Sequence, residues 1–357
     1  MKRFVTAGFA IVLLHGKDND MKKRMICLAA AVCLILSGCG SSTAKQGESG
    51  NAESATVQED GKVTLKVGTN LALGTASPYV ALNQGYFDDS SVGIELAEFS
   101  DGSALMEAFA AGELDIAFVG IAPVATWQNK GIDLKVVAAA NGGGHVLMTR
   151  EETGIESVAD LKGKKVAEPN ISTVTDALLR DKILPSGGLT QEDITAVSGM
   201  KPADMASVLE VTKEVDAIIT WEPYASQAEA MYDDLKVVYD SASVIKEETG
   251  SDSFYPVNVV IASQELIDSN PEALTEFLSV YKKTVDFINE DDSANAVLAE
   301  ILSLDESVIE NARKRIDYTY EVDVDGIMNT LQWSYDLDYI TALPEASDLI
   351  DTSYLGE

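Results

Sequence analysis

The chain has few cysteines, few histidines and little positive charge. Its three cysteines are Cys27, Cys33 and Cys39, so everything after Cys39 lacks a thiol. Disulfides, thiolate metal sites and a cysteine nucleophile are therefore excluded from that part of the chain. His145 is the only histidine there, which also excludes a relay or a zinc site that needs two histidines. We expect no metal, no cofactor and no catalytic residue.

The shortage of basic residues gives the chain a strong negative charge. The sequence holds 26 Lys and Arg against 58 Asp and Glu, for a formal charge of −32. Residues 1–38 carry six basic and two acidic residues, so the remainder has 20 basic and 56 acidic, or −36. A field of this sign repels nucleic acid and anionic lipid surfaces. An anionic ligand would have to be held by local groups.

With 357 residues, of which 46% are hydrophobic, the chain is long enough for two lobes with cores of their own. One stretch, Glu113–Ala125, indicates how they are built. Leu114–Val119 is nearly all apolar, which is typical of a strand buried on both faces, and Gly120 with Pro123 then turns the chain into a helix. Such a joint leaves backbone N–H groups free at the edge of a sheet, where ligands bind.

The same pattern returns about a hundred residues later, as Glu214–Ala225, with one residue fewer at the turn. Asp216 matches Asp115, and Pro223 matches Pro123. Two equivalent edges predict two α/β lobes that face each other across a gap, as in a ligand clamp. The alternative is that strand–turn–helix joints look alike in any α/β protein.

The N-terminus has the features of an export signal. Met21–Arg24 is positively charged, and Met25–Leu36 is an apolar run too short to span a bilayer as a helix. Leu36–Cys39 follows and resembles the lipobox of bacterial lipoproteins, in which cleavage leaves a lipid-modified Cys39. We expect residues 1–38 to be a signal peptide whose true start is Met21, and residues 39–61, rich in Ser, Gly, Ala and Glu, to be a lipidated flexible tether.

Strands and helices alternate along the rest of the chain. Strands are expected at residues 63–68, 93–99, 114–119, 134–140, 194–197 and 235–239, with a further strand ending at Ala167. The glycine-rich Asn141–His145 is expected to be a flexible crossing between the lobes, and residues 256–262 the crossing back. Lobe 1 is then residues 62–141 plus 255–357, and lobe 2 is residues 145–250. After Asn270, an apolar stripe at helical spacing indicates a core helix.

Three stretches carry a resemblance to a known family. Asp160–Ala167, the turn Gly112–Asp115 with the joint that follows it, and the corner Trp221–Tyr224 are similar to substrate-binding proteins of ABC transporters for nitrate, taurine and alkanesulfonates. The resemblance covers residues 62–350. It implies a two-lobed periplasmic-binding-protein-like α/β fold of type II, with mixed sheets flanked by helices and a hinge between the lobes.

The ligand is expected outside the carboxyl ends of the strands, where helix N-termini offer partial positive charge and N–H donors. The hydroxyl groups at this edge are predicted to bind ligand or, alternatively, to serve as ordinary helix caps. Trp221 is expected to supply a flat apolar wall. The predicted ligand-binding residues are Asn70, Ser77, Asp101, Ser103, Gly120, Ile121, Asn170, Ser172, Thr173, Trp221 and Glu222.

Two charged residues at this edge have open roles. Glu222 would repel an anion, so it either faces solvent or indicates a ligand with a cationic or hydrogen-bond-donating part. Lys201 could contact an anion, but a surface lysine is the simpler interpretation.

The resemblance implies that the lobes close on a small anion, swinging about residues 141–145 and 253–258, and deliver it to an ABC permease and its ATPase. The protein would sit on the extracytoplasmic face of a bacterial membrane, anchored by its lipid. A binding protein for a thiamine-pyrimidine-type precursor, an enzyme on the same fold and a surface interaction protein without a small ligand are the alternatives. The lack of cysteine and the single histidine argue against the enzyme.

Overall fold

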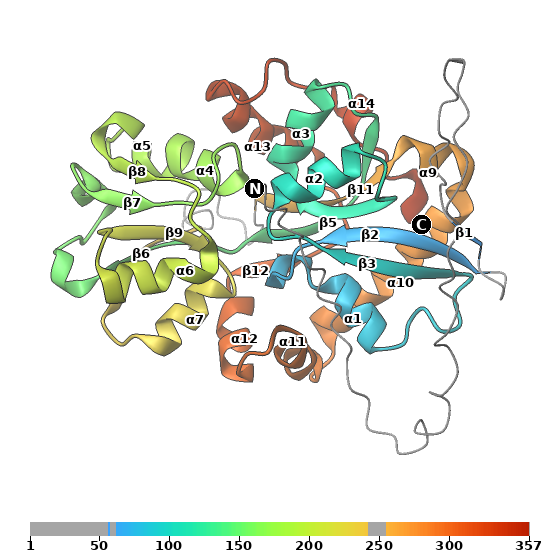
Figure 1. The fold of residues 1–357 in the computed structure, drawn as a ribbon, viewed down its shortest axis with the longest axis horizontal. Coiled ribbons are helices and arrows are strands. Elements are labelled where there is room, and N and C mark those ends of the chain that lie inside the picture. Colours follow the sequence, from blue (N-terminus) through green and yellow to red (C-terminus); the bar gives the residue numbers. More distant parts are fainter. Residues whose placement is uncertain (1–55, 58–61, 242–254, 357) are drawn as a thin grey trace, which may run out of the picture. The chain divides into compact units, whose positions relative to one another are not determined.

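The computed structural model describes residues 56–57, 62–241 and 255–356 (Figure 1). The predicted signal peptide, Cys39 and most of the predicted tether lie outside the described residues. Thr56–Val57 at the end of that tether forms a short strand, β1, which pairs with the next strand. None of the described helices combines the length and apolar character that a membrane span requires.

Seven strands form a mixed sheet in the order β1-β2-β4-β11-β5-β12, with β3 beside β2. Strands β2, β3 and β4 are parallel, whereas β11 runs antiparallel to both β4 and β5. The strands after β1 are β2 (Val63–Thr69), β3 (Val92–Glu98), β4 (Ile116–Gly120), β5 (Leu134–Gly143), β11 (Pro256–Ser263) and β12 (Ile316–Tyr318). The apolar run that predicted a doubly buried strand is β4, in the middle of this sheet.

The intervening part of the chain forms a second sheet of five strands, in the order β10-β6-β9-β7-β8. Its strands are β6 (His145–Arg150), β7 (Lys165–Ala167), β8 (Thr195–Val197), β9 (Ala217–Trp221) and β10 (Leu235–Asp240). Strand β7 is parallel to β8 and β9, and β6 is antiparallel to β9 and β10. The α/β class and the mixed sheets flanked by helices are confirmed.

Helices cover both faces of the seven-stranded sheet. In Figure 1, α2 (Gly102–Ala110), α3 (Ile121–Asn129) and α13 (Val324–Asp336) lie over one face, and α1 (Ser77–Asn83) and α10 (Pro271–Glu290) over the other. The remaining helices that accompany this sheet are α9 (Gln264–Ser269), α11 (Ala294–Leu302), α12 (Glu306–Arg313) and α14 (Ala346–Leu349). The apolar stripe predicted after Asn270 is the buried face of α10, where Tyr281 packs edge-on against Phe118 at 5.4 Å between ring centroids.

The helices of the five-stranded sheet are shorter. Helix α4 (Val174–Leu178) continues as a π-helical turn and then as α5 (Leu184–Ser186), and α6 (Pro202–Ser207) continues as a second π-helical turn. Helix α7 (Tyr224–Met231) follows β9 directly. Both joints recognised in the sequence are thus strand-to-helix joints, β4 to α3 and β9 to α7.

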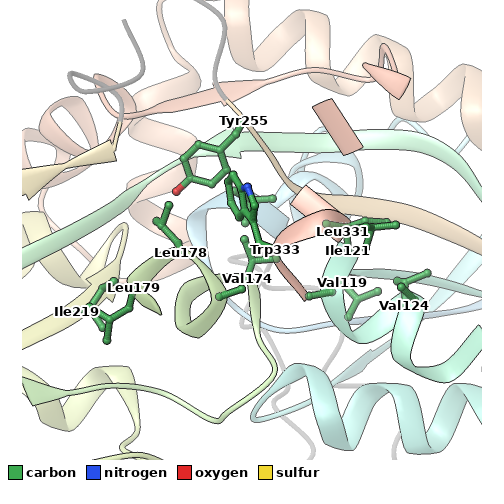
Figure 2. Packing of buried hydrophobic residues seen from close by; sticks show 14 of the residues in the cluster. Val119, Ile121, Val124, Val174, Leu178, Leu179, Ile219, Tyr255, Leu331 and Trp333 are labelled. Atoms are coloured by element: carbon green, nitrogen blue, oxygen red, sulfur yellow. The ribbon is translucent and has the colours of Figure 1, made fainter. Parts of the chain in front are cut away.

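One apolar cluster extends over both sheets. It includes Val119 and Leu331 beside the seven-stranded sheet and Val174 and Ile219 beside the five-stranded sheet. Figure 2 shows Trp333 of α13 among these side chains, close to Val174 at the start of α4. The elements that support the two sheets therefore share a core on this side.

The glycines of residues 141–145 are part of the sheets rather than an irregular crossing. Strand β5 extends to Gly143 and pairs there with β12, and β6 begins at His145. All five residues are buried. Gly143 and Gly144 have positive φ, of 69° and 90°, and a Cβ on Gly144 would lie 2.9 Å from the Ile316 side chain. The prediction that this stretch connects two parts of the fold is correct, but its backbone is held by strand pairing.

The sequence repeat has a structural counterpart. The Asp115 carboxylate accepts a hydrogen bond from the Lys66 N–H at 2.8 Å, and the Asp216 carboxylate accepts one from the Lys165 N–H, also at 2.8 Å. Each aspartate stands just before a buried strand and ties down the neighbouring parallel strand, β2 or β7. The repeat therefore marks the same position in each sheet.

Removing these carboxylates leaves a backbone donor without its partner. We expect Asp115→Ala to lower the free energy of unfolding by about 2 kcal/mol and Asp216→Ala by about 1 kcal/mol, since the bond to Asp115 is the more buried of the two. Urea unfolding measures both. Glu214→Ala, an exposed residue two positions before Asp216, is the control and should change little. Equal effects at residues 214 and 216 would contradict this role.

Candidate functional site

A cavity of about 230 Å³ lies where loops from both sheets meet. Its wall takes residues that follow β2, β4, β7, β8 and β9, all at the carboxyl ends of parallel strands. The start of α4 and the paired ends of β5 and β11 complete it. This is the edge at which the strand order of an open α/β sheet places a ligand.

Eight of the eleven predicted ligand-binding residues line the cavity. They are Asn70, Asp101, Ser103, Gly120, Asn170, Thr173, Trp221 and Glu222. Ser77, Ile121 and Ser172 are not among the lining residues. Ser77 is 1% exposed at the first position of α1 and is not its cap, Ile121 is fully buried in the apolar cluster, and the Ser172 N–H donates to the Asp176 carboxylate. Their part in binding stays a prediction.

Asp101 already occupies the helix end that was expected to offer free donors. Its Oδ1 accepts hydrogen bonds from the N–H groups of Ser103, at 2.9 Å, and Ala104, at 3.0 Å. This carboxylate caps α2 and puts a negative charge at the rim of the cavity. The donors of this helix are therefore satisfied within the protein.

Thr173 also serves as a helix cap. Its hydroxyl donates to the carbonyl of Asn170 at 2.9 Å and accepts from the Asp176 N–H at 3.3 Å. At the start of α3 the cap is Gly120, which has no side chain to accept the first-turn N–H groups. A Cβ on Gly120 would lie 3.7 Å from the Val174 side chain, so the starts of α3 and α4 face each other closely.

Two cavity asparagines were missed in the sequence. The Asn258 amide donates to Asn141 Oδ1 at 2.6 Å, and the two residues face each other in the register of β11 and β5. Gly74 approaches so closely that a Cβ there would lie 2.4 Å from Asn141 Oδ1. With Asn70 and Asn170, four neutral amides border the cavity. The signal in the sequence was an asparagine that interrupts an apolar strand, at Ala140-Asn141 and at Val257-Asn258-Val259.

His145 is a neutral structural residue in the cavity wall. Its Nδ1 lies 2.6 Å from the Tyr255 hydroxyl and its Nε2 lies 2.9 Å from the Thr175 hydroxyl, so both ring nitrogens are used. Complete burial lowers the pKa of His145 to about 3. The half-buried Trp221 meets the imidazole edge-on, with 6.5 Å between ring centroids. Both rings line the cavity at 73° to each other, and an apolar wall for the ligand at Trp221 stays a prediction.

Glu222 is buried and paired, which contradicts the alternative that it faces solvent. It is 1% exposed, and Arg315 Nη1 lies 2.8 Å from its Oε1. The backbone N–H and the hydroxyl of Ser226 each donate to the same carboxylate at 3.0 Å. Burial raises the pKa of Glu222, although the bonds from Arg315 and Ser226 act against the rise. Arg315 also bonds Glu229 and Asp240, so it connects the end of α12 to α7 and β10.

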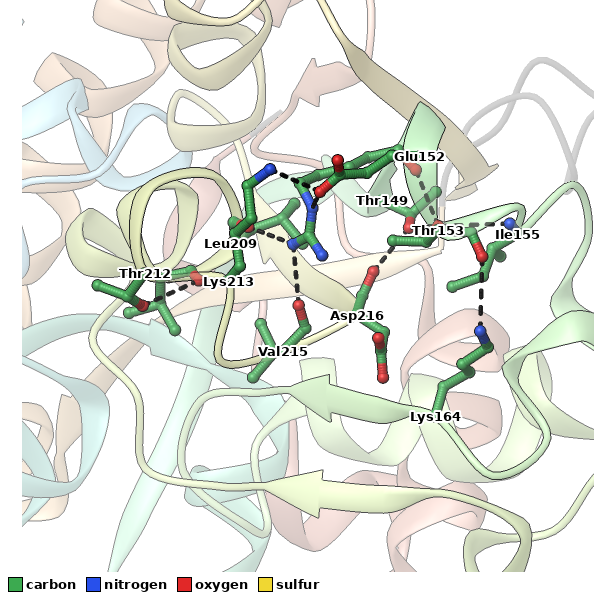
Figure 3. A network of polar contacts seen from close by, with 12 residues as sticks. Thr149, Glu152, Thr153, Ile155, Lys164, Leu209, Thr212, Lys213, Val215 and Asp216 are labelled. Carbon is green, nitrogen blue, oxygen red and sulfur yellow. Dashed lines mark hydrogen bonds and ion pairs between the residues drawn. The ribbon is translucent and has the colours of Figure 1, made fainter.

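Among the described residues that line the cavity there is no arginine. The buried Arg150 serves the five-stranded sheet instead, donating to the carbonyls of Leu209 and Val215 and pairing with Glu152. Figure 3 shows Leu209, Val215 and Glu152 in this polar network. Lys201, an exposed side chain, is the one lysine among the described lining residues. The cavity therefore presents backbone N–H groups, neutral amides and aromatic rings.

Two helix-flanked sheets around a shared cavity, with loops from the carboxyl ends of both, define the periplasmic-binding-protein fold class. The chain matches the family described as NMT1/THI5 like over residues 74–294, and it belongs to this family.

Relatives and solved structures agree with this assignment. A Bacillus subtilis (strain 168) protein named "Putative aliphatic sulfonates-binding protein" is 28% identical over 346 residues, which cover 94% of this chain and 96% of that protein. The ligand binding component of an ABC-type import system from Staphylococcus aureus, solved with zinc bound, has a TM-score of 0.72 at 17% identity, covering 82% of this chain and 97% of its own. The periplasmic aliphatic sulphonate binding protein SsuA from Escherichia coli has a TM-score of 0.66 at 22% identity, covering 80% and 97%. At these identities the two structures establish the fold.

Loss of Arg315 leaves Glu222 buried without its cation. We expect Arg315→Met to lower the free energy of unfolding at pH 7 by roughly 3 kcal/mol, because an unpaired buried carboxylate is strongly destabilising. Urea unfolding should show that Glu222→Gln in the same chain recovers much of the loss. Arg313→Met, at the last residue of α12 and bonded to Asn295 and a backbone carbonyl, is the control and should cost about 1 kcal/mol. No recovery in the double variant would contradict the pairing.

Neutral His145 makes stability depend on pH. Its folded-state pKa of about 3 lies below the ordinary histidine pKa of 6.5, so the stability gained from the neutral ring is present above pH 6.5 and is lost as pH falls toward 3. We expect His145→Gln to be less stable than the natural chain at pH 7 but to lose less stability between pH 7 and pH 4.5. The difference in slope is at most about 1.4 kcal/mol per pH unit. Parallel stability curves would show that His145 is not held neutral.

Proposed function

We propose that this chain is the extracytoplasmic binding protein of an ABC importer and that it captures a small sulfonate-class oxyanion for a permease and its ATPase. Membership of the family and the sulfonate relative that spans 94% of the chain support this. The single observation that carries it is the cavity shared by the strand ends of both sheets. The family relatives are binding proteins, which favours binding over catalysis.

An oxyanion would be held mainly by neutral donors. The first turn of α3, with Gly120 as its cap, offers N–H groups and the positive end of a nine-residue helix. Asn70 and Asn170 bring amide donors from one side each of the cavity, and Trp221 offers an apolar surface for an alkyl group. Glu222 does not repel the anion strongly, since it is paired with Arg315, whereas Asp101 keeps its negative charge at the rim although its carboxylate caps a helix.

Capture would proceed by closure of two lobes, residues 62–141 plus 255–357 and residues 145–250. The cavity takes residues from both, and the paired strands β5 and β11 lie between them near Asn141 and Asn258. A ligand that contacts both lobes binds the closed form better and so shifts the population toward it. The permease then recognises the surface of the closed form. The lipobox-like Leu36–Cys39 supports a lipid anchor at Cys39 on the extracytoplasmic face of the membrane.

A pyrimidine-type ligand is the second candidate. The four asparagine amides around the cavity offer paired donors and acceptors, which suit a ring with exocyclic nitrogen better than they suit a sulfonate. The half-buried indole of Trp221 in the cavity wall suits a planar ring.

Ligand binding separates the candidates. We expect ethanesulfonate or taurine to raise the melting temperature, with a stabilisation of about 2.7 kcal/mol at a ligand concentration a hundred times the Kd. If an aminopyrimidine raises the melting temperature and the two sulfonates do not, the second candidate is favoured. Trp221→Ala should weaken the affinity measured by calorimetry at least roughly tenfold, which corresponds to a loss of about 1.4 kcal/mol of binding free energy.

The matched control is Trp127→Ala. Trp127 lies on α3 under Lys130 and is not among the lining residues, so its loss should leave the affinity unchanged. A Trp221→Ala variant that binds like the natural chain would contradict the site, and the absence of binding by any of these compounds would contradict the function.

A further inference from the structure

A buried carboxylate stands directly behind the wall of the cavity. Glu168 is fully buried, and the next two residues, Pro169 and Asn170, line the cavity. Its Oε1 accepts hydrogen bonds from Ser198 Oγ and Arg180 Nη2, each at 2.5 Å. Its Oε2 is buried and has no partner among the described residues. A carboxylate oxygen in that position is costly unless something satisfies it.

A second carboxylate lies within hydrogen-bonding reach of the first. Asp176 Oδ1 accepts from Arg180 Nε at 2.5 Å, and Asp176 Oδ2 accepts from the Ser172 N–H at 3.0 Å. Asp176 also contacts Glu168, and Tyr339, which follows α13, bonds Asp176. Two carboxylates thus share one guanidinium, and the buried cluster carries a net negative charge when both are ionised.

A single proton on Glu168 would remove both the unpartnered oxygen and the net negative charge of the cluster. Protonated Glu168 would donate from Oε2 to Asp176, which satisfies the orphan oxygen and makes the cluster neutral. Burial is the largest cause that raises the pKa of Glu168, to about 7, and Asp176 acts in the same direction, while Ser198 and Arg180 act against it. The acids Asp336 and Asp338, which border the surface hollow that Arg180 also lines, add further negative charge on that side.

We propose that Glu168, Asp176 and Arg180 form a buried proton-binding site in the wall of the ligand cavity, and that its proton strengthens the binding of an anionic ligand. The inference rests on the proposed function for the nature of the ligand. The same cluster holds the loop of residues 170–173 in place. The Asp176 carboxylate accepts a hydrogen bond from the Ser172 N–H, and the Thr173 hydroxyl accepts from the Asp176 N–H while it donates to the Asn170 carbonyl. The charge of the cluster and the charge of a bound anion would therefore lie on opposite sides of the short segment formed by residues 169–173.

Binding and protonation are then linked, and the link is reciprocal. An anion in the cavity raises the pKa of Glu168, and the proton on Glu168 raises the affinity for the anion. Affinity should fall as pH rises through about 7, the folded-state pKa. For charges on the order of 10 Å apart in an effective dielectric of about 20, the affinity falls roughly fivefold between pH 6 and pH 8.

The test measures ethanesulfonate binding by calorimetry from pH 5.5 to pH 8.5, because the charge of this probe does not change in that range. The natural chain should show the fall in affinity and should take up protons on binding near pH 7. Glu168→Gln, whose amide can donate to Asp176 as the protonated acid would, should keep its pH 6 affinity at pH 8. Ser198→Ala removes a hydrogen bond that favours the charged form and should move the fall to higher pH.

Glu210→Gln is the matched control. Glu210, in the π-helical turn after α6, also has a raised pKa and a buried oxygen without a partner among the described residues. It is not among the cavity-lining residues. This variant should keep the pH profile of the natural chain. The inference is overturned if the pH dependence of the affinity persists in Glu168→Gln and disappears in Glu222→Gln. Glu222 lines the cavity and also has a raised pKa.

A ligand-free measurement separates this inference from the proposed function. The carboxyl carbon of Glu168, assigned by comparison with Glu168→Gln in NMR spectra, should titrate near pH 7. A midpoint near 4.5, the ordinary pKa of a glutamate, overturns the inference whether or not ethanesulfonate binds. A midpoint near 7 with no ethanesulfonate binding by the natural chain upholds the proton site and contradicts the sulfonate assignment and the coupling.

Discussion

Strand pairing at the point where the chain passes between its two sheets is the constraint on which the rest of the structure depends. Strands β5, β11 and β12 lie side by side there, and Asn141 faces both Asn258 and Tyr318 in their register. The polypeptide must leave one sheet for the other with its backbone hydrogen bonds satisfied, because this region is buried. The pairing meets that demand and also brings the Asn141 and Asn258 amides to the cavity. Architecture and binding chemistry thus have one origin.

The sequence predicted the fold well because local patterns specify it. The apolar run of β4, the glycine and proline that follow it and the second copy before α7 are each readable within a dozen residues. The Asp115 and Asp216 positions in the repeat reflect the same hydrogen bond to a neighbouring parallel strand. The glycines at residues 142–144 were misinterpreted because flexibility was inferred from composition, whereas pairing with the distant β12 determines their conformation.

The site was predicted less completely, for a physical reason. Strand ends and helix starts show where a cavity forms, and most of the expected residues line it. What each side chain does there depends on partners far away in the sequence. Arg315 neutralises Glu222 from 93 residues away, and Tyr255 meets His145 from 110 residues away. No local pattern announces such a pair. Thr173 and Asp101, by contrast, act on neighbours, and for the Thr173 hydroxyl the capping role was one of the two interpretations available from the sequence.

The described residues of the cavity lining include no arginine, which has a consequence for selectivity under the proposed function. A pocket that holds an anion through amides and helix ends would offer no formal countercharge to replace the water around a doubly charged solute such as sulfate. Dehydration costs rise steeply with ionic charge, so such a pocket would favour weakly hydrated monoanions. Background electrolyte would also affect such binding little, since buried dipoles are screened far less than exposed charges.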